Sequence, residues 1–194
     1  MMRTLCRFAS LALATALTSL PAAAHTGLET GFTLIGGALH PLRGFDHVAA
    51  MLCVGLWAAL ARGRAQWAFP LAFVAAMVAG GVVARSGPAG PAVETGIALS
   101  VIGLGLAVAG GLKVPTLAGA VAIAAFGVLH GAAHGAEAPG GSFAGYALGF
   151  AASTMVLLAS GFVAARLIET LSDERPVRIA GAAAAAAGLV LIMR

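Results

Sequence analysis

Charged side chains are scarce in this 194-residue chain, where Lys, Arg, Asp and Glu together fill only 9% of the positions. Soluble domains carry charge at about 25% of positions and are about 45–50% apolar, whereas 60% of this chain is hydrophobic. This composition argues against a soluble enzyme and against a disordered segment. The net charge of +4 is also too small and too scattered for a surface that tracks phosphates, so we expect no nucleic-acid partner.

Cysteine is almost missing as well, because the chain has only Cys6 and Cys53. Two cysteines so placed do not form a disulfide framework. Cys53 lies in an apolar run, where we interpret it as a packing residue.

The first 24 residues have the pattern of a secretory signal peptide. Two arginines precede the apolar stretch Phe8–Leu20, and a proline and three alanines lead to His25. The alternative is a short first transmembrane helix, but the stretch is short for a span of about 20 residues. We predict a signal peptide over 1–24, cleavage before His25, and a single transmembrane helical domain over 25–194.

Six apolar blocks follow, and their lengths are typical of transmembrane helices. They cover Phe45–Ala61, Trp67–Ala84, Val93–Leu112, Pro115–His134, Ser142–Leu167 and Pro176–Met193. Pro41 and Gly44 interrupt the apolar stretch that leads into the first block. Because a proline removes a backbone donor and a glycine loosens a helix, we expect a short half-helix before this break. The sequence therefore predicts an all-α membrane protein with six spans.

The basic residues predict the orientation of these spans. If the mature N-terminus is outside the cytoplasm, six Lys and Arg side chains fall on the cytoplasmic side: Arg62, Arg64, Lys113, Arg166, Arg175 and Arg178. Only Arg43, Arg85 and Arg194 fall outside. This excess has the sign that the positive-inside rule requires. We expect a multi-pass protein of the bacterial inner membrane with both mature termini in the periplasm.

All five histidines fall on the outer side in this topology: His25, His40, His47, His130 and His134. Two of the seven acidic residues, Asp46 and Glu137, accompany them. Ionisable groups within membrane segments are costly and usually functional. This cluster is therefore the main functional signal of the sequence.

The later group of this cluster begins with His130 and His134. They are four residues apart, so they share one helix face, on which two imidazoles could bind one cation. Glu137 follows three residues later and stays on that face if the helix continues. The alternative interpretation is a polar helix end at the membrane surface.

The earlier group comprises His40, Asp46 and His47, on both sides of the proline break. Asp46 could bind a cation directly or hold His47 in one tautomer. Alternatively, it could simply pair with Arg43.

Together the two groups predict one divalent-metal site near the outer face. The shared site requires the first and fourth spans to pack together, and we expect Gly127 and Gly131 to allow the close approach. Imidazole ligands suit Ni, Co, Zn and Cu.

We interpret Met51 as a core residue, whereas His25, as a free N-terminus, could add a ligand or simply be a chain end. Ser100 could line a polar path or only bond to another helix.

At these residues the chain closely resembles the HupE/UreJ family of membrane proteins associated with nickel supply to hydrogenase and urease. The family signature H-x5-D-H is complete in His40, Asp46 and His47, and the later F-H-G-x-A-H-G-x-E is matched from Leu129 to Glu137 except that Leu129 replaces the aromatic residue. Glu94, followed by Ser100, is similar to another family feature. The resemblance covers the whole chain. It implies permeation of Ni²⁺, with Co²⁺ as the usual alternative, and no permanently bound cofactor.

Two rival functions remain open. One is an intramembrane metal-dependent hydrolase, in which an open metal position would activate water. Against it, the motif H-E-x-x-H is absent, because Gly131 follows His130. The other is a non-transporting accessory or metal-storage role. For a permease, the sequence contains no nucleotide-binding loop of the G-x-x-x-x-G-K-[ST] type, so energy would come from a gradient or from an unknown partner subunit. We predict a permease in contact with the lipid bilayer, and not an enzyme.

Overall fold

The computed structural model describes residues 34–86, 90–136 and 143–193. The predicted signal peptide, His25 and Glu137 lie outside these residues. None of the described residues forms a strand, and their elements are α2 (Leu34–Leu39), η1 (Pro41–Arg43), α3 (Phe45–Ala61), α4 (Ala65–Val83), η2 (Ala84–Ser86), α5 (Pro91–Gly110), α6 (Thr116–Ala136), α7 (Phe143–Leu171) and α8 (Arg175–Ile192).

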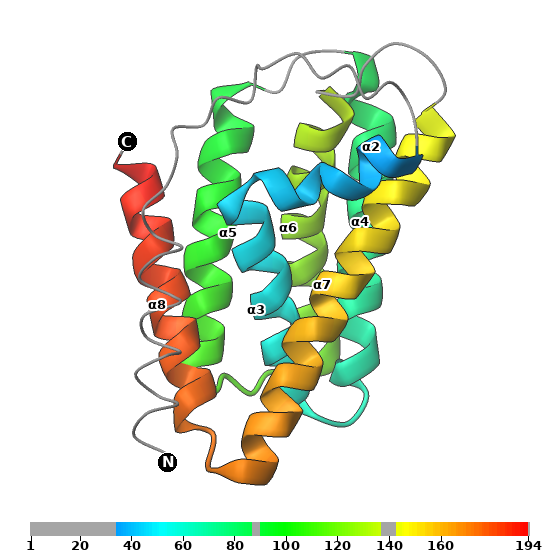
Figure 1. The fold of residues 1–194 in the computed structure, drawn as a ribbon. Coiled ribbons are helices and arrows are strands. Elements are labelled where there is room, and N and C mark those ends of the chain that lie inside the picture. Colours follow the sequence, from blue (N-terminus) through cyan, green and yellow to red (C-terminus); the bar gives the residue numbers. More distant parts are fainter. Residues whose placement is uncertain (1–33, 87–89, 137–142, 194) are drawn as a thin grey trace.

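Five of these helices are long and apolar enough to cross a membrane, and the bent pair formed by α2–η1 and α3 is a sixth candidate. The two halves of this pair meet at 89°, and Figure 1 shows α2 crossing the bundle while α3 runs along it. Pro41 starts η1, and Gly44 is extended with φ −102° and ψ 120°. The predicted all-α membrane fold, with a half-helix before the first span, is confirmed. α3 has the predicted bounds, and α7 extends to Leu171 rather than Leu167.

The long helices associate in three close pairs: α4 with α6, α5 with α8, and α3 with α7, which also contacts α2. Glycines sit in each contact. A side chain at Gly131 would overlap the carbonyl of Met77 on α4, one at Gly161 would overlap Leu52 on α3, and one at Gly105 would crowd Gly181 and Ala185 on α8. Small residues of this kind let membrane helices approach closely.

The prediction that Gly127 and Gly131 bring the first and fourth spans together is wrong. Both glycines face α4, where they contact the backbone at Phe73 and Met77. Between α3 and α6 the close ring contacts are made by histidine side chains. The spacing of small residues shows which face of a helix is closely packed, but it does not identify the neighbour.

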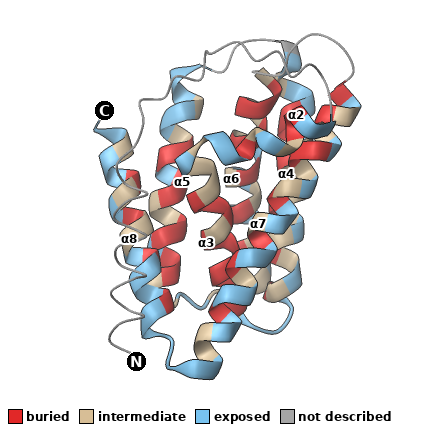
Figure 2. Cartoon of the chain, viewed as in Figure 1, coloured by how far each residue is buried: buried red, intermediate tan, exposed pale blue. Residues whose placement is uncertain are grey.

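Burial is greatest on α3 and on the inward faces of the helices around it (Figure 2). The outward faces remain apolar, with Val83, Leu117 and Leu171 each more than three-quarters exposed. An apolar surface of this extent fits contact with lipid.

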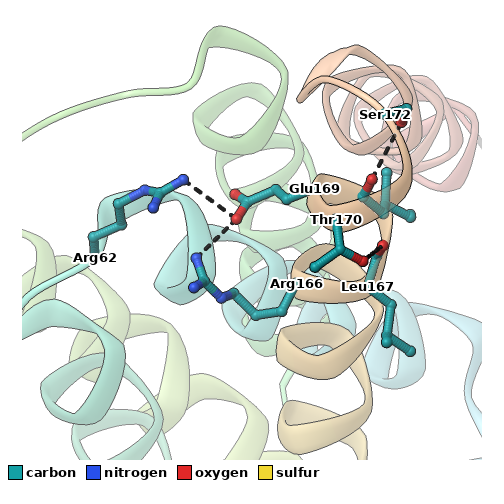
Figure 3. Close-up of polar contacts among 7 residues, drawn as sticks. Arg62, Arg166, Leu167, Glu169, Thr170 and Ser172 are labelled. Atoms are coloured by element: carbon teal, nitrogen blue, oxygen red, sulfur yellow. Dashed lines mark hydrogen bonds and ion pairs between the residues drawn. The ribbon is translucent and has the colours of Figure 1, made fainter.

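The six basic residues expected on the cytoplasmic side all lie at one end of the bundle, where α3, α5 and α7 end and α4, α6 and α8 begin (Figure 1). Two ion pairs on Glu169 of α7 lie there, and the pair with Arg62 links α7 to the end of α3. Figure 3 shows Arg62, after α3, and Arg166 of α7 both donating to Oε2 of Glu169, at 3.3 and 2.8 Å. In addition, Arg178 donates to the carbonyls of Ala109 and Gly110 at the end of α5.

Candidate metal site

Two elements that are distant in sequence supply the histidines of the site. The corner between α2 and α3 positions His40 just before Pro41, and Asp46 and His47 in the first turn of α3. The last two turns of α6 carry His130 and His134, whose side chains are fully buried. The proline break thus turns the chain toward α6 at the point where the polar residues lie.

The histidine rings of both groups meet. The ring centre of His47 lies 4.8 Å from that of His130 and 4.7 Å from that of His134. His40 in turn lies 4.8 Å from His134. The expected convergence of the two groups is confirmed, and His47 is its central member.

Asp46 binds its neighbour His47 rather than Arg43. Its Oδ1 lies 2.8 Å from Nδ1 of His47 and also accepts the backbone N–H of His47 at 2.8 Å. No ion pair joins Arg43 to Asp46, although both lie in the described part of the chain. The carboxylate therefore contacts both the ring and the backbone of His47.

Within the part of the chain that the structure describes, four buried ring nitrogens of the histidines have no hydrogen-bond partner: His47 Nε2, His130 Nδ1, and both nitrogens of His134. Buried polar atoms in folded proteins nearly always have a partner, so each exception needs an explanation. Here the exceptions belong to rings in mutual contact, which suggests that they serve a ligand that binds several imidazoles at once.

Among the described residues, no three His, Cys, Asp or Glu side chains are arranged to hold a metal. The planes of the histidine rings meet at angles of 57° to 81°. The spacing does fit. Two imidazoles that each bind a metal at about 2.1 Å bring their ring centres to about 5 Å. The broad χ2 torsion of histidine allows the rings to rotate into place.

Aromatic side chains surround the histidines. Phe150 stacks on His134 with 5.2 Å between ring centres, Phe73 lies 5.4 Å from His130, and Tyr146 lies 5.7 Å from His40. Sequence reasoning missed these three residues. The only signal for them was the four-residue spacing of Tyr146 and Phe150, which puts both on one face of α7.

The other candidate residues of the sequence differ in whether they contact the histidines. Ser100 is fully buried, and its Oγ lies 2.9 Å from Nε2 of His130. Glu94 is exposed in the first turn of the same helix, and the structure shows no contact between its described side chain and the histidines. Met51 and Cys53 are buried in the apolar core, as predicted.

Comparison with known proteins gives a match over nearly the whole chain. A family model described as "HupE / UreJ protein" matches residues 13–191. Protein HupE of Rhizobium leguminosarum bv. viciae is 43% identical over 171 residues, which cover 88% of this chain and 89% of that protein. No solved structure matches the chain.

Proposed function

The chain belongs to the HupE/UreJ family, and from this premise we propose that it is a permease for the divalent nickel ion. The ion would pass from the periplasm to the cytoplasm across the bacterial inner membrane. Cobalt is the alternative cargo, since the family is associated with nickel and cobalt supply in hydrogenase and urease systems. In this proposal residues 1–24 are a signal peptide and residues 25–194 form one transmembrane domain.

The buried ring nitrogens without partners carry this proposal. Neutral imidazole nitrogens suit Ni²⁺ and Co²⁺, and ionisable groups within a membrane bundle are usually functional. We propose that the ion is bound by His40, His47, His130 and His134, with Asp46 acting on His47. Glu137 would join from beyond the end of α6, and His25 and Glu94 would be secondary capture groups.

The surroundings of the site favour transport over hydrolysis. A hydrolase needs a general base within hydrogen-bond reach of a metal-bound water. The carboxylate of Asp46 is engaged by the His47 ring and backbone. The rings of Phe73 and Phe150, which also pack against the histidines, carry no group that could accept a proton.

The test is accumulation of radiolabelled nickel at submicromolar concentration in cells that express the protein. Replacing His47 or His134 by Ala should lower uptake to background. Loss of a group that only orients a metal ligand weakens metal binding about 10–100-fold, and loss of the ligand itself should weaken it more. His25→Ala should be milder. Uptake in competition with cobalt ranks the two ions.

Controls are needed because His134 is fully buried. His134→Gln keeps most of the volume but removes the imidazole, so it should also abolish uptake with normal protein levels in the membrane. Ser160→Ala, an exposed change on α7, should leave uptake unchanged. Full uptake by both His134 variants would contradict the proposed site, and turnover of a hydrolysable substrate without uptake would favour the enzyme.

A further inference from the structure

Ser100 of α5 touches the site without belonging to either histidine motif. Its side chain is fully buried. The Oγ atom lies 2.6 Å from the carbonyl oxygen of Ile97 and 2.9 Å from Nε2 of His130. A hydroxyl has one proton to donate and lone pairs that accept, so its two contacts cannot both use the same proton.

The two distances indicate which contact uses the hydroxyl proton. Hydrogen bonds of the O–H···O type are typically about 2.7–2.8 Å long, and N–H···O bonds about 2.9–3.0 Å. The shorter contact therefore fits donation from Ser100 to Ile97. Ser100 then accepts the longer bond from an N–H at Nε2 of His130. In the neutral ring this leaves Nδ1 without a proton and with its lone pair available.

The opposite arrangement is unfavourable. If Ser100 donated to Nε2, the proton of His130 would sit on Nδ1, which is buried without a partner. Most buried side-chain polar atoms in native proteins have a partner, and a buried N–H without an acceptor carries the full cost of its lost hydration. The Nδ1–H tautomer would also place a proton on the ring nitrogen of His130 that has no hydrogen-bond partner, where an ion could otherwise bind.

His47 has the opposite arrangement of its nitrogens. Asp46 binds its Nδ1, so the nitrogen that remains without a partner is Nε2. The rings of His47 and His130 lie 4.8 Å apart. Two partners on different helices thus leave one bare nitrogen on each of two neighbouring rings.

We propose that Ser100 is a positioning residue that holds His130 in the Nε2–H tautomer, so that His130 binds the ion through Nδ1 while His47 binds it through Nε2. This inference rests on the proposed metal site. Ser100 itself does not touch the ion. Its role is to supply the acceptor that selects the tautomer and orients the ring.

The test is the tautomer of His130 in the full chain, labelled with ¹⁵N-histidine, embedded in lipid nanodiscs and freed of metal with a chelator. The His130 resonances are those lost in His130→Gln. Wild-type protein should show a protonated Nε2 and a bare Nδ1. Ser100→Ala should give a mixture of tautomers, and Ser100→Thr, which keeps the hydroxyl, should restore the wild-type pattern.

Equilibrium binding of Ni²⁺ is the second measurement. Ser100→Ala should weaken it about 10–100-fold, the usual effect of removing a group that orients a ligand, and Ser100→Thr should recover it. Ser160→Ala is the matched control, because the hydroxyl of Ser160 donates to the carbonyl of Val156 at 2.7 Å on an exposed face. A protonated Nδ1 in wild-type protein would overturn the proposal, as would unchanged tautomer and affinity in Ser100→Ala. Failure of wild-type protein to bind nickel would overturn the permease, but the metal-free spectrum would still test Ser100.

Discussion

Three of the closely packed imidazoles, those of His47, His130 and His134, differ in what holds them. His47 is bound by a carboxylate and His130 by a hydroxyl. Neither nitrogen of His134 has a hydrogen-bond partner in the described part of the chain, and its ring is placed by stacking on Phe150 at 22° between planes and by contacts with two other imidazoles. His134 is therefore the ring that can rotate with the least loss of hydrogen bonding when an ion arrives.

Asp46→Asn should weaken nickel binding about 10–100-fold without unfolding the protein. The amide keeps the shape of the side chain but lacks the negative charge. That charge polarises the His47 ring and makes its Nε2 a stronger metal ligand. Equilibrium competition with a metallochromic chelator measures the affinity. Asp173→Asn changes an exposed carboxylate at the far end of the bundle and is the control. Equal affinities for the Asp46 and Asp173 variants would show that Asp46 does not act on the metal.

At this scale the sequence predicted more than is usual, for a physical reason. Histidine and aspartate are so rare in an apolar chain that their positions alone marked the site, and helical spacing placed His130 and His134 on one face. The partners of these residues were not predictable. Ser100 meets His130, and Phe150 meets His134, across contacts between different helices, and the spacing within one helix does not determine which helix lies opposite.

At the scale of the helices, the bend was predictable and the pairing was not. Pro41 and Gly44 act on the backbone at their own positions, so the break could be located from the sequence. The partner of α6 depends on how the faces of all the helices fit together. This is why Gly127 and Gly131 were assigned to the wrong contact.

Gly131→Ala should destabilise the protein by about 3 kcal/mol or more. This is the upper end of the usual free-energy cost of overpacking a core, or above it. The new Cβ would overlap the backbone carbonyl of Met77, which cannot rotate away as a side chain could. The α4–α6 pair would separate and displace the adjacent His130. Thermal unfolding in detergent and nickel binding should both show the defect.

Gly110→Ala is the matched control, because a Cβ there has no neighbour within 4 Å and φ is not positive. It lies at the end of α5, where Ala is the better helix former. The melting temperature should be unchanged or slightly higher. A stable, metal-binding Gly131→Ala protein would mean that α4 and α6 are not as closely packed as the structure shows.

At the scale of the whole molecule, the site joins all three helix pairs. The α2–α3–α7 group supplies His47, the α4–α6 pair supplies His130, and the α5–α8 pair supplies Ser100. Close glycine contacts lie within each pair. A bound ion would thus connect the α2–α3–α7 group to the α4–α6 pair through His47 and His130, and Ser100 of the α5–α8 pair would contact it only through His130.

The distribution of charge along the bundle predicts its orientation in the membrane. Arg62, Arg64, Lys113, Arg166, Arg175 and Arg178 lie at one end. At the other end the described residues include Arg43 and Arg85, and Arg85 lies over the ring of Phe143 at 5.0 Å. Because cytoplasmic loops carry the excess of Lys and Arg, the six-residue end should face the cytoplasm and the histidine site should open toward the periplasm.

Single cysteines test this orientation in a background where Cys6 and Cys53, the two thiols of the chain, are both replaced by Ala. Gly90→Cys places a thiol at an exposed position before α5, and Ser172→Cys places one at the exposed turn between α7 and α8. Neither change alters a charge, so neither disturbs the signal being tested. A membrane-impermeant maleimide should label Gly90→Cys in spheroplasts with an intact inner membrane, and Ser172→Cys only after permeabilisation. The reverse pattern would place the histidines on the cytoplasmic side, where they could not capture nickel from the periplasm, and the permease would then have to run outward.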